Sequence, residues 1–458
     1  MMTDTIVAPA TPPGRGGVAV LRVSGPATMQ VIDTIIQKKL SPRLANLAHI
    51  RDDDGSVIDE VLAIYFPNPA SFTGEDVLEI HCHGGPVIVD SIMSRCLASG
   101  CRLAKPGEFT ERAFLNDKMD LIQAEAVADM IDAHSKHAAK AAMQSLQGHF
   151  STRINTLNTQ VIQLRMYVEA AIDFPEEEID FLADESLHQK LKLITEEFVH
   201  ILSAAQSGKV LREGIKLVIV GLPNAGKSSL INALVEREIA IVTHIEGTTR
   251  DLLREEISIN GLPVQIVDTA GIRDANDIVE SIGIDRAWDE VQEADLVILL
   301  RDATQVNEVI LNSLDLSDWE LASDIQNRIP TSSHLILVNN KIDSLQVEPL
   351  TITKDINILP ISAKFGMGIE KLKTLIHELS GYHNLGESSV LARKRHIECI
   401  ENAQRHVGLG VAHLKNSRAG ELLAEELRLA HQYLSQMTGE FTSDDLLGEI
   451  FSNFCIGK

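Results

Sequence analysis

A glycine-rich loop between an apolar run and an amphipathic stretch constrains this chain most. Residues 221–229 read Gly-Leu-Pro-Asn-Ala-Gly-Lys-Ser-Ser and follow the apolar run 217–220. The spacing G-x-x-x-x-G-K-S between a strand and a helix is typical of a phosphate-binding loop, because glycines let backbone amides point inward and the helix start adds partial positive charge. Lys227 would reach the β- and γ-phosphates, and the Ser228 hydroxyl would bind Mg²⁺. The strand and helix context disfavours the alternative, an ordinary glycine turn.

Size and charge limit the remaining possibilities. At 458 residues the chain should form about two to four domains. Its net charge of −24 excludes a general attraction to nucleic acid or an acidic membrane, so a nucleic-acid partner would need a local basic patch. No apolar run has transmembrane length and no signal pattern begins the chain, which predicts a cytoplasmic protein without a membrane partner. Five cysteines without CxxC spacing fit a reducing compartment and disfavour zinc.

Hydrophobic periodicity divides the chain into regions. Up to about residue 116, short β-rich runs at 18–21, 61–66 and 77–80 alternate with turns, which predicts a compact α+β domain. Apolar residues then recur every three or four positions over 154–171 and 187–205, and again over 423–437. Helical stretches therefore flank the phosphate loop, which indicates one helical domain with a nucleotide domain inserted. The predicted domains are 1–116 (N-terminal), 117–212 (helical, first part), 213–380 (inserted) and 381–458 (helical, second part).

The inserted region alternates strands with helical patterns, which indicates a doubly wound α/β fold. After the strand 264–267 comes Asp268-Thr269-Ala270-Gly271, where the Asp can hold the Mg²⁺ shell and the Gly271 amide can sense the γ-phosphate. Thr249, within the run 247–251, is placed to close on Mg²⁺ as a switch.

A fourth motif predicts the base. Asn340-Lys341-Ile342-Asp343 follows the strand 335–338, and an ionised Asp343 can accept the guanine ring N–H and amino group together. Adenine would leave this carboxylate unpaired, a mismatch that typically costs a few kcal/mol. Ser362-Ala363-Lys364, after the strand 358–361, would supply a backbone amide to the guanine oxygen. Five such motifs in order, each at a strand end, predict a GTPase.

The residue that orients the attacking water remains open at this point. Ras-like GTPases use a glutamine directly after the Asp-x-x-Gly motif, but Ile272 stands there in this chain. The acids downstream, Asp274, Asp277 and Glu280, are the candidates. Spacing alone favours the alternative for each, a solvated carboxylate in a switch loop.

With these motifs in place, the whole chain resembles the MnmE (TrmE) family of tRNA-modification GTPases. The specific marks are Thr5-Ile6-Val7-Ala8, Pro13-Gly14-Arg15-Gly16-Gly17, Phe72-Thr73-Gly74-Glu75-Asp76, Pro106-Gly107-Glu108-Phe109, Phe114-Leu115-Asn116-Asp117-Lys118 and the ending Phe454-Cys455-Ile456-Gly457-Lys458. The resemblance implies an N-terminal domain similar to folate-binding enzymes, which also dimerises, and a helical domain carrying an inserted Ras-like GTPase. It implies a homodimer and a flavoprotein partner, MnmG (GidA), in a heterotetramer. Together the pair would add an aminomethyl or carboxymethylaminomethyl group to C5 of the wobble uridine of certain tRNAs.

The resemblance also assigns residues to the cofactors. For 5-formyltetrahydrofolate or a related tetrahydrofolate, the family motif places Arg22, Glu79, Lys118 and Lys458 on the contacting positions. Two or three cations suit glutamyl carboxylates and one acid suits a pterin N–H edge. Without the resemblance all four would be interpreted as surface charges.

For the GTPase the resemblance implies a K⁺ ion beside the phosphates, where it would offset developing charge. Its ligands would be Asn224, Thr243, Thr248 and the backbone carbonyl of Ile245, while Ser228 and Thr249 bind Mg²⁺. Glu280 would position the water, with Lys227 and Thr249 also catalytic, and two GTPase domains of a dimer would meet when K⁺ and nucleotide bind. The predicted GTP-binding residues are Asn224, Ala225, Gly226, Lys227, Ser228, Ser229, Thr243, Thr248, Thr249, Asp268, Thr269, Ala270, Gly271, Asn340, Lys341, Asp343, Ser362, Ala363 and Lys364.

Several alternatives stay open. Cys455, close to Lys458, could have a lowered pKa and act in covalent chemistry, or it could be a small packing residue near the folate. An Era-like ribosome-assembly switch is disfavoured because the chain after residue 379 is helical and has no G-x-x-G loop. A regulatory scaffold, in which MnmG performs all the chemistry, is compatible with the sequence. The sequence does not identify the tRNAs used or how tRNA is contacted.

Overall fold

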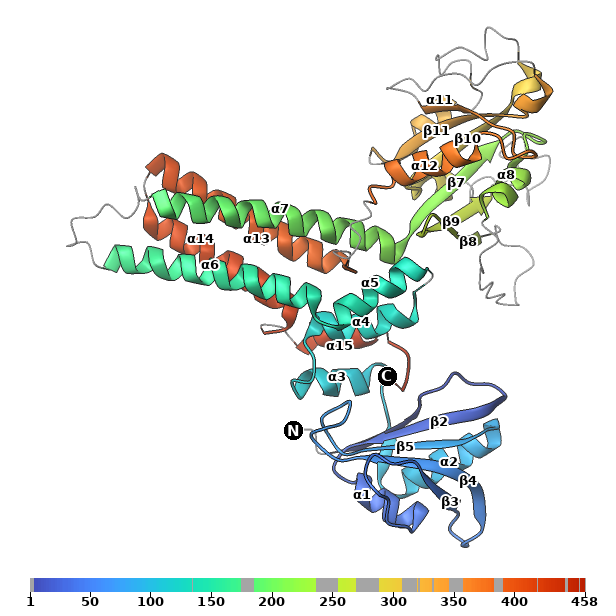
Figure 1. Ribbon diagram of the computed structural model, residues 1–458, viewed down its shortest axis with the longest axis vertical. Coiled ribbons are helices and arrows are strands. Elements are labelled where there is room, and N and C mark those ends of the chain that lie inside the picture. The colour runs from blue at the N-terminus through green and yellow to red at the C-terminus, as the bar shows by residue number, and fades with distance from the viewer. Residues whose placement is uncertain are drawn as a thin grey trace. The chain divides into compact units, whose positions relative to one another are not determined.

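The computed structural model folds into two compact units, described here separately. The first comprises 1–131, 143–197 and 399–458, and the second comprises 132–142 and 198–398. Figure 1 traces the chain from the blue N-terminal strands to the red C-terminal helices. The structure describes residues 4–133, 135–173, 185–235, 254–268, 288–306, 319, 322–331, 333–345, 357–382, 390–417, 419–440, 444–452 and 454–457.

The N-terminal part of the first unit contains a six-stranded sheet. Its strands are β1 (Thr5–Pro9), β2 (Gly16–Ser24), β3 (Asn46–Arg51), β4 (Val57–Phe66), β5 (Val77–Gly84) and β6 (Cys101–Leu103). The strand order is β3-β4-β5-β2-β1-β6, and neighbours are antiparallel except for the parallel pair β1 and β6. The predicted strands at 18–21, 61–66 and 77–80 lie within β2, β4 and β5, so these predictions are confirmed.

One face of this sheet carries the hydrophobic core. Helix α2 (Pro86–Ala98) packs on the sheet, and α1 (Thr28–Val31) and the π-helical turn η1 (Ile32–Ile36) add to the same cluster. Successive side chains of a strand point to opposite faces, so in β2 Leu21 is buried whereas Val18 is 62% exposed. The predicted α+β domain is therefore present.

Helices form the rest of the first unit and part of the second. They are α3 (Glu108–Leu115), α4 (Leu121–Ile131), α5 (Lys136–Leu146), α6 (His149–Asp173), α7 (Glu185–Glu213), α13 (Lys394–Ser417), α14 (Gly420–Thr438) and α15 (Asp444–Ser452). Helices α6 and α14 pack side by side (Figure 1). The apolar positions that predicted them, apart from the half-buried Ala171, are at most 2% exposed: Ile154, Leu157, Val161, Leu164, Val168, Leu423, Leu427, Ala430, Leu434 and Met437.

The second unit contains a second six-stranded sheet, with strands β7 (Ile215–Gly221), β8 (Arg254–Ile259), β9 (Leu262–Asp268), β10 (Leu296–Asp302), β11 (His334–Asn340) and β12 (Asn357–Pro360). The order is β12-β11-β10-β7-β9-β8, parallel except for the antiparallel hairpin β8–β9. The other elements that the structure describes in this sheet's domain are α8 (Lys227–Leu234), α11 (Ala322–Gln326), α12 (Ile369–Leu379) and the 3₁₀ turns η3 (Ala303–Gln305) and η5 (Ile342–Ser344). The predicted doubly wound fold is confirmed, with a mixed sheet.

The central strands of this sheet explain why the apolar runs predicted it. Strands β7 and β10 are buried over nearly their whole length, as expected for parallel strands covered on both faces. Apart from Lys216 near the amino end of β7, their side chains are apolar until the carboxyl ends, where β7 finishes with Gly221 and β10 with Arg301 and Asp302. The fold therefore confines functional side chains of this sheet to one edge.

A buried ion network connects helix α3 to the first sheet. The Arg112 side chain, 1% exposed, donates from Nη2 to Glu108 Oε1 at 3.0 Å and to Asp4 Oδ1 at 2.9 Å, and from Nη1 to Glu75 Oε2 at 3.1 Å. Burial would raise the pKa of Glu108, but hydrogen bonds from Arg102, the Lys105 amide and Arg112 outweigh it and hold the pKa below its ordinary value. The network therefore stabilises the ionised form of Glu108.

The pKa of a second glutamate in helix α3, Glu111, is shifted in the opposite direction from that of Glu108. Burial raises the pKa of Glu111, and the negative charge of Glu108 raises it further. The ionised carboxylate of Glu111 therefore opposes folding, whereas that of Glu108 favours it.

We expect Glu108→Gln to destabilise the first unit by about 3 kcal/mol at pH 7, because it removes one member of a buried ion network. A depressed folded pKa contributes stability above the unfolded value of about 4.3, and this contribution is lost as the pH falls through the folded pKa. The difference from wild type should therefore shrink below about pH 4. Glu111→Gln is the matched control and should be neutral or stabilising at pH 7. Thermal melts from pH 3 to 8 measure both, and equal losses in the two variants would contradict the network.

Candidate nucleotide-binding site

The loop between β7 and α8 has the backbone that its sequence predicted. Asn224 and Gly226 adopt left-handed conformations, with φ of 65° and 98°. A Cβ atom on Gly226 would lie only 2.3 Å from Nδ2 of Asn340, so both backbone angle and space require glycine. The loop therefore approaches the end of β11 as closely as backbone allows.

Lys227 begins helix α8 and lies across this loop. Its Nζ donates to the carbonyl oxygens of Gly221 at 2.9 Å and Leu222 at 3.5 Å. Ser228 and Ser229 follow within the first helical turn, where backbone N–H groups have no partner in the helix. A helix start beside an ammonium group is an anion-binding arrangement.

The Asn340 side chain joins three loops. Its Nδ2 donates to the carbonyl oxygen of Ala225 at 2.9 Å, and its Oδ1 accepts from the Ala363 amide at 3.0 Å. Asn340 is 2% exposed, so both bonds are sheltered from water. The structure thus brings together the predicted residues from the loops after β7, β11 and β12.

Asp343 is held by the loop after β12. Its Oδ1 accepts from Ser362 Oγ at 2.5 Å, and the Ser362 amide donates to the carbonyl of Met367 at 2.9 Å. The backbone adds a bond from the Ile342 amide to the Ile361 carbonyl at 3.2 Å. Lys364 extends over the ring of Phe365, with Nζ 5.2 Å from the ring centroid. The Asp343 carboxylate is therefore oriented by neighbours that leave the rest of the group available for a ligand.

Sequence reasoning missed Asp302, at the end of β10. Its Oδ2 lies 2.7 Å from Nζ of Lys341, and in the β10–β11 register it is opposite Asn340. Burial would raise the pKa of Asp302, but hydrogen bonds from Lys341 and Thr304 outweigh it and lower the pKa. The signal was present, because Asp302 is the acid that ends a strand whose residues 296–300 are all apolar.

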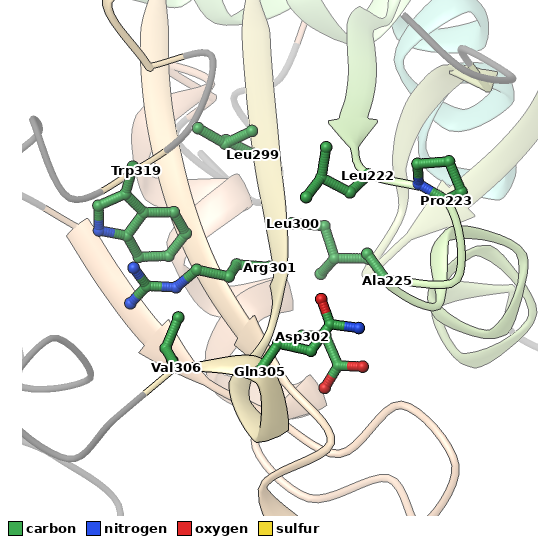
Figure 2. A pocket seen from close by; sticks show the side chains of 10 residues that line it. All are labelled: Leu222, Pro223, Ala225, Leu299, Leu300, Arg301, Asp302, Gln305, Val306 and Trp319. Atoms are coloured by element: carbon green, nitrogen blue, oxygen red, sulfur yellow. The ribbon is translucent and has the colours of Figure 1, made fainter. Parts of the chain in front are cut away.

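A pocket of about 180 Å³ lies beside the phosphate loop. In Figure 2 the side chains of Leu222, Pro223 and Ala225 lie on one side and Arg301 and Trp319 on the other. The Arg301 guanidinium stacks on Trp319 at 3.8 Å from the ring centroid, and Arg301 Nε donates to Asn339 Oδ1 at 3.0 Å. No motif pointed to this pair, because the two residues are distant in sequence.

Of the remaining predicted residues, Asp268 has a described backbone and the others lie outside the described part of the chain. Asp268 ends β9 and pairs with Ile219 of β7, which places its backbone next to the strand that leads into the loop. The residues outside the described ranges are Thr243, Ile245, Thr248, Thr249, Thr269, Ala270, Gly271, Asp274, Asp277, Glu280 and Lys458.

The described residues include two of the predicted metal ligands. Ser228 stands in the first turn of α8 and Asn224 in the loop before it, and both offer oxygen atoms, which Mg²⁺ and other hard cations prefer. Within the described ranges there is no cluster of three or more His, Cys, Asp or Glu residues that could hold a metal ion. The oxygen atoms of Ser228 and Asn224 are suitable donors for the expected Mg²⁺ and K⁺, respectively.

The predicted folate-binding residues Arg22 and Glu79 face each other on β2 and β5. Arg22 Nη2 lies 2.8 Å from Glu79 Oε1, and its guanidinium carbon lies 5.4 Å from the ring centroid of Phe72 and 5.7 Å from that of Phe109. Lys118 does not join this pair in a described contact, and its Nζ donates to the Pro69 carbonyl at 3.0 Å.

The C-terminal segment returns to the N-terminal sheet within the first unit. The Gly107 amide donates to the Cys455 carbonyl at 3.4 Å, and a Cβ on Gly457 would lie 2.1 Å from the Pro9 carbonyl oxygen. Pro9 ends β1, whose Ala8 pairs with Arg22. Cys455 is exposed and free, so both interpretations of this thiol stay open.

No helix among the described residues combines the length and the apolar character needed to cross a membrane. All five cysteines lie in described parts of the chain, and none of them forms a disulfide there.

Comparisons with known proteins cover the whole chain. The family model "GTP-binding protein TrmE N-terminus" matches residues 5–118, and the model "MnmE helical domain" matches residues 121–455. A tRNA modification GTPase MnmE of Proteus mirabilis is 52% identical over 459 residues, covering 100% of this chain and 99% of the relative. That of Vibrio parahaemolyticus is 52% identical over 461 residues, covering 100% of both.

Among solved structures, the FeoB G-domain from Methanococcus jannaschii is 26% identical, with a TM-score of 0.26, and covers 36% of this chain and 97% of that domain. The family models and the full-length relatives account for the N-terminal domain, the helical domain and the Ras-like domain together. The chain therefore belongs to the MnmE (TrmE) family and is a GTPase of tRNA modification.

Proposed function

We propose that this GTPase works with the flavoprotein MnmG, in a heterotetramer, on the wobble uridine of certain tRNAs. The pair adds an aminomethyl or carboxymethylaminomethyl group to C5, and a tetrahydrofolate such as 5-formyltetrahydrofolate is the related cofactor. The observation that carries this proposal is 52% identity over the full length of both chains, which extends beyond the GTPase domain. A relative matched only through its GTPase domain would not support a shared substrate.

The guanine site of this proposal rests on Asp343. Its carboxylate accepts the ring N–H and the amino group of guanine, while Ser362 holds it in place at 2.5 Å. The Ala363 amide is held by Asn340 on the same side. Because Asn340 also binds the Ala225 carbonyl, the base-binding and phosphate-binding loops are positioned together.

Phosphoryl transfer is assigned to the loop, the start of α8 and the switch residues. Lys227 and the amides of the first helical turn bind the β- and γ-phosphates, and Glu280 orients the attacking water. Ser228 and Thr249 hold Mg²⁺, and Asn224, Thr243, Ile245 and Thr248 hold K⁺. These ions supply positive charge beside the phosphates, and this charge stabilises the transition state. Two GTPase domains of a dimer come together in this state.

The folate site is assigned to Arg22, Glu79, Lys118 and Lys458. The Arg22–Glu79 ion pair supports this proposal, because a pterin edge that donates to Glu79 can share that carboxylate with Arg22. The return of the C-terminal segment to the end of β1 supports a place for Lys458 and Cys455 near the same cofactor.

The proposal also includes a homodimer formed through the N-terminal domain and a cytoplasmic location. Domain boundaries near residues 116, 212 and 380 belong to it as well. The family models, which end at 118 and begin at 121, support the first boundary. The lack of disulfides among the five described cysteines supports a reducing compartment.

Asp343→Asn should weaken GTP binding at least tenfold and shift preference toward xanthosine triphosphate. The exchange turns an acceptor into a donor, and losing a hydrogen bond to a charged group costs about 2 kcal/mol. Xanthine presents a carbonyl where guanine has its amino group, so it matches the new amide. Titration of both nucleotides against both proteins measures the shift, and unchanged GTP affinity in the variant would rule out the guanine assignment.

GTP turnover should be markedly faster in K⁺ than in Na⁺, because the smaller ion fits poorly among Asn224 and the switch ligands. Asn224→Gly is the informative variant, since glycine tolerates the φ of 65° but lacks the side-chain oxygen. It should lower the ratio of the rates in K⁺ and Na⁺. Hydrolysis that is indifferent to the monovalent cation in wild type would remove the K⁺ model.

Glu280→Ala should bind GTP normally and bring the GTPase domains together, yet hydrolyse GTP more slowly by about 10²–10⁴. If hydrolysis is needed to reopen the dimer, tRNA modification should collapse with it. A simple on-switch would modify tRNA as well as or better than wild type when held in its GTP state. Mass spectrometry of wobble uridines, made by the variant with MnmG and excess GTP, separates these models. Normal modification despite blocked hydrolysis would contradict coupling.

A further inference from the structure

We propose that Asp302 is a positioning residue for the guanine nucleotide: it holds the Lys341 ammonium away from Asp343, so that Asp343 stays free to accept the base. The inference rests on the proposed role of the loop 340–343 in guanine binding. Neither a motif nor the nucleotide set predicted from the sequence contains Asp302.

The carboxylate of Asp302 is fully engaged by its surroundings. Oδ2 lies 2.7 Å from Lys341 Nζ, and Oδ1 accepts from the Thr304 amide at 3.0 Å and from Thr304 Oγ1 at 2.7 Å. The side chain is 8% exposed. A carboxylate bound on both oxygens and sheltered from water provides a fixed anchor for the Lys341 ammonium.

The backbone conformation and the long side chain of Lys341 explain why the ammonium needs this anchor. Lys341 adopts a left-handed conformation, with φ of 67°, between Asn340 and the turn η5. This conformation is uncommon for a residue other than glycine. The Lys341 side chain also has a flexible four-carbon stem, which must be ordered if the ammonium is to stay in one place. The bond to Asp302 fixes the position of the ammonium. The methylene stem of Lys341 therefore keeps one conformation beside the loop and can offer an apolar surface to a planar base.

Electrostatics give Asp302 a second effect. Asp343 stands only two residues after Lys341, and a released ammonium could pair with its carboxylate. Such a pair would occupy the acceptor that guanine requires, so nucleotide binding would first have to break it. Because the pKa of Asp302 is lowered, its carboxylate is ionised at neutral pH and competes for Lys341.

Asp302 also caps the 3₁₀ turn η3, because its side chain accepts from the Thr304 amide. The variant Asp302→Asn distinguishes this capping role from the proposed positioning of Lys341. Asparagine can still accept from the Thr304 amide, since Asn is as good a cap as Asp, but it lacks the negative charge that holds Lys341. We expect the variant to bind GDP about tenfold more weakly, as for loss of a charge-assisted bond. The KM for GTP should rise by a similar factor, with kcat unchanged, because Asp302 contacts neither the phosphates nor the predicted catalytic residues.

Two further variants complete the experiment. Asp302→Asn combined with Lys341→Met should bind GDP no more weakly than Lys341→Met alone, because the anchor has no function without its lysine. Glu293→Gln is the matched control. Glu293 Oε2 also pairs with a lysine, Lys216, at 2.8 Å, but at the amino end of β7, so this variant should leave the GDP affinity unchanged.

The outcomes are distinguishable. If Asp343→Asn leaves the GTP affinity unchanged, the proposed guanine role of this loop fails. If Asp343→Asn weakens GTP binding but Asp302→Asn binds GDP like wild type, the loop assignment stands and the Asp302 inference is overturned. A lowered melting temperature in Asp302→Asn with unchanged KM would identify Asp302 as a cap alone and would also overturn it.

Discussion

The two hydrogen bonds of the Asn340 side chain hold the nucleotide site together. One buried amide group binds the Ala225 carbonyl and the Ala363 amide, and so connects loops that follow three different strands. A buried polar group left without its partner costs about 1–3 kcal/mol, so neither loop can separate without a penalty. The same contact requires glycine at position 226. Base recognition and phosphate binding therefore share one rigid junction rather than two independent loops.

This junction exists because parallel strands end at one edge of the sheet. Strands β7, β10, β11 and β12 are neighbours and parallel, so the loops at their carboxyl ends converge. That is why the fold and the main loops could be predicted from sequence: each motif follows an apolar run, and the runs must be buried together. Helices α6, α7 and α14 were predictable for a similar reason, since their apolar positions repeat with the helical period and are buried.

What the sequence did not reveal depends on contacts between distant residues. Asp302 and Lys341 meet only because β10 and β11 pair in one particular register, and Arg301 stacks on Trp319 on one side of the pocket. The Arg112 network joins residues more than a hundred positions apart, such as Asp4. No local pattern encodes such pairs, because register and strand order are set by packing of the whole sheet. The antiparallel β8 was missed for a different reason, because the Asn260-Gly261 turn that joins it to β9 is a local hairpin signal that was overlooked.

The way the chain passes between its two units bears on how nucleotide state can affect the rest of the protein. The boundaries after residues 142, 197 and 398 fall inside helices α5, α7 and α13, respectively. Each of these helices thus contributes residues to both units. A helix keeps its backbone hydrogen bonds along its whole length, whereas a flexible linker does not. Helix α7 ends at Glu213, and only Gly214 separates it from β7, the strand that leads into the phosphate loop. The phosphate loop is therefore connected to the 29-residue helix α7 through one strand and one glycine.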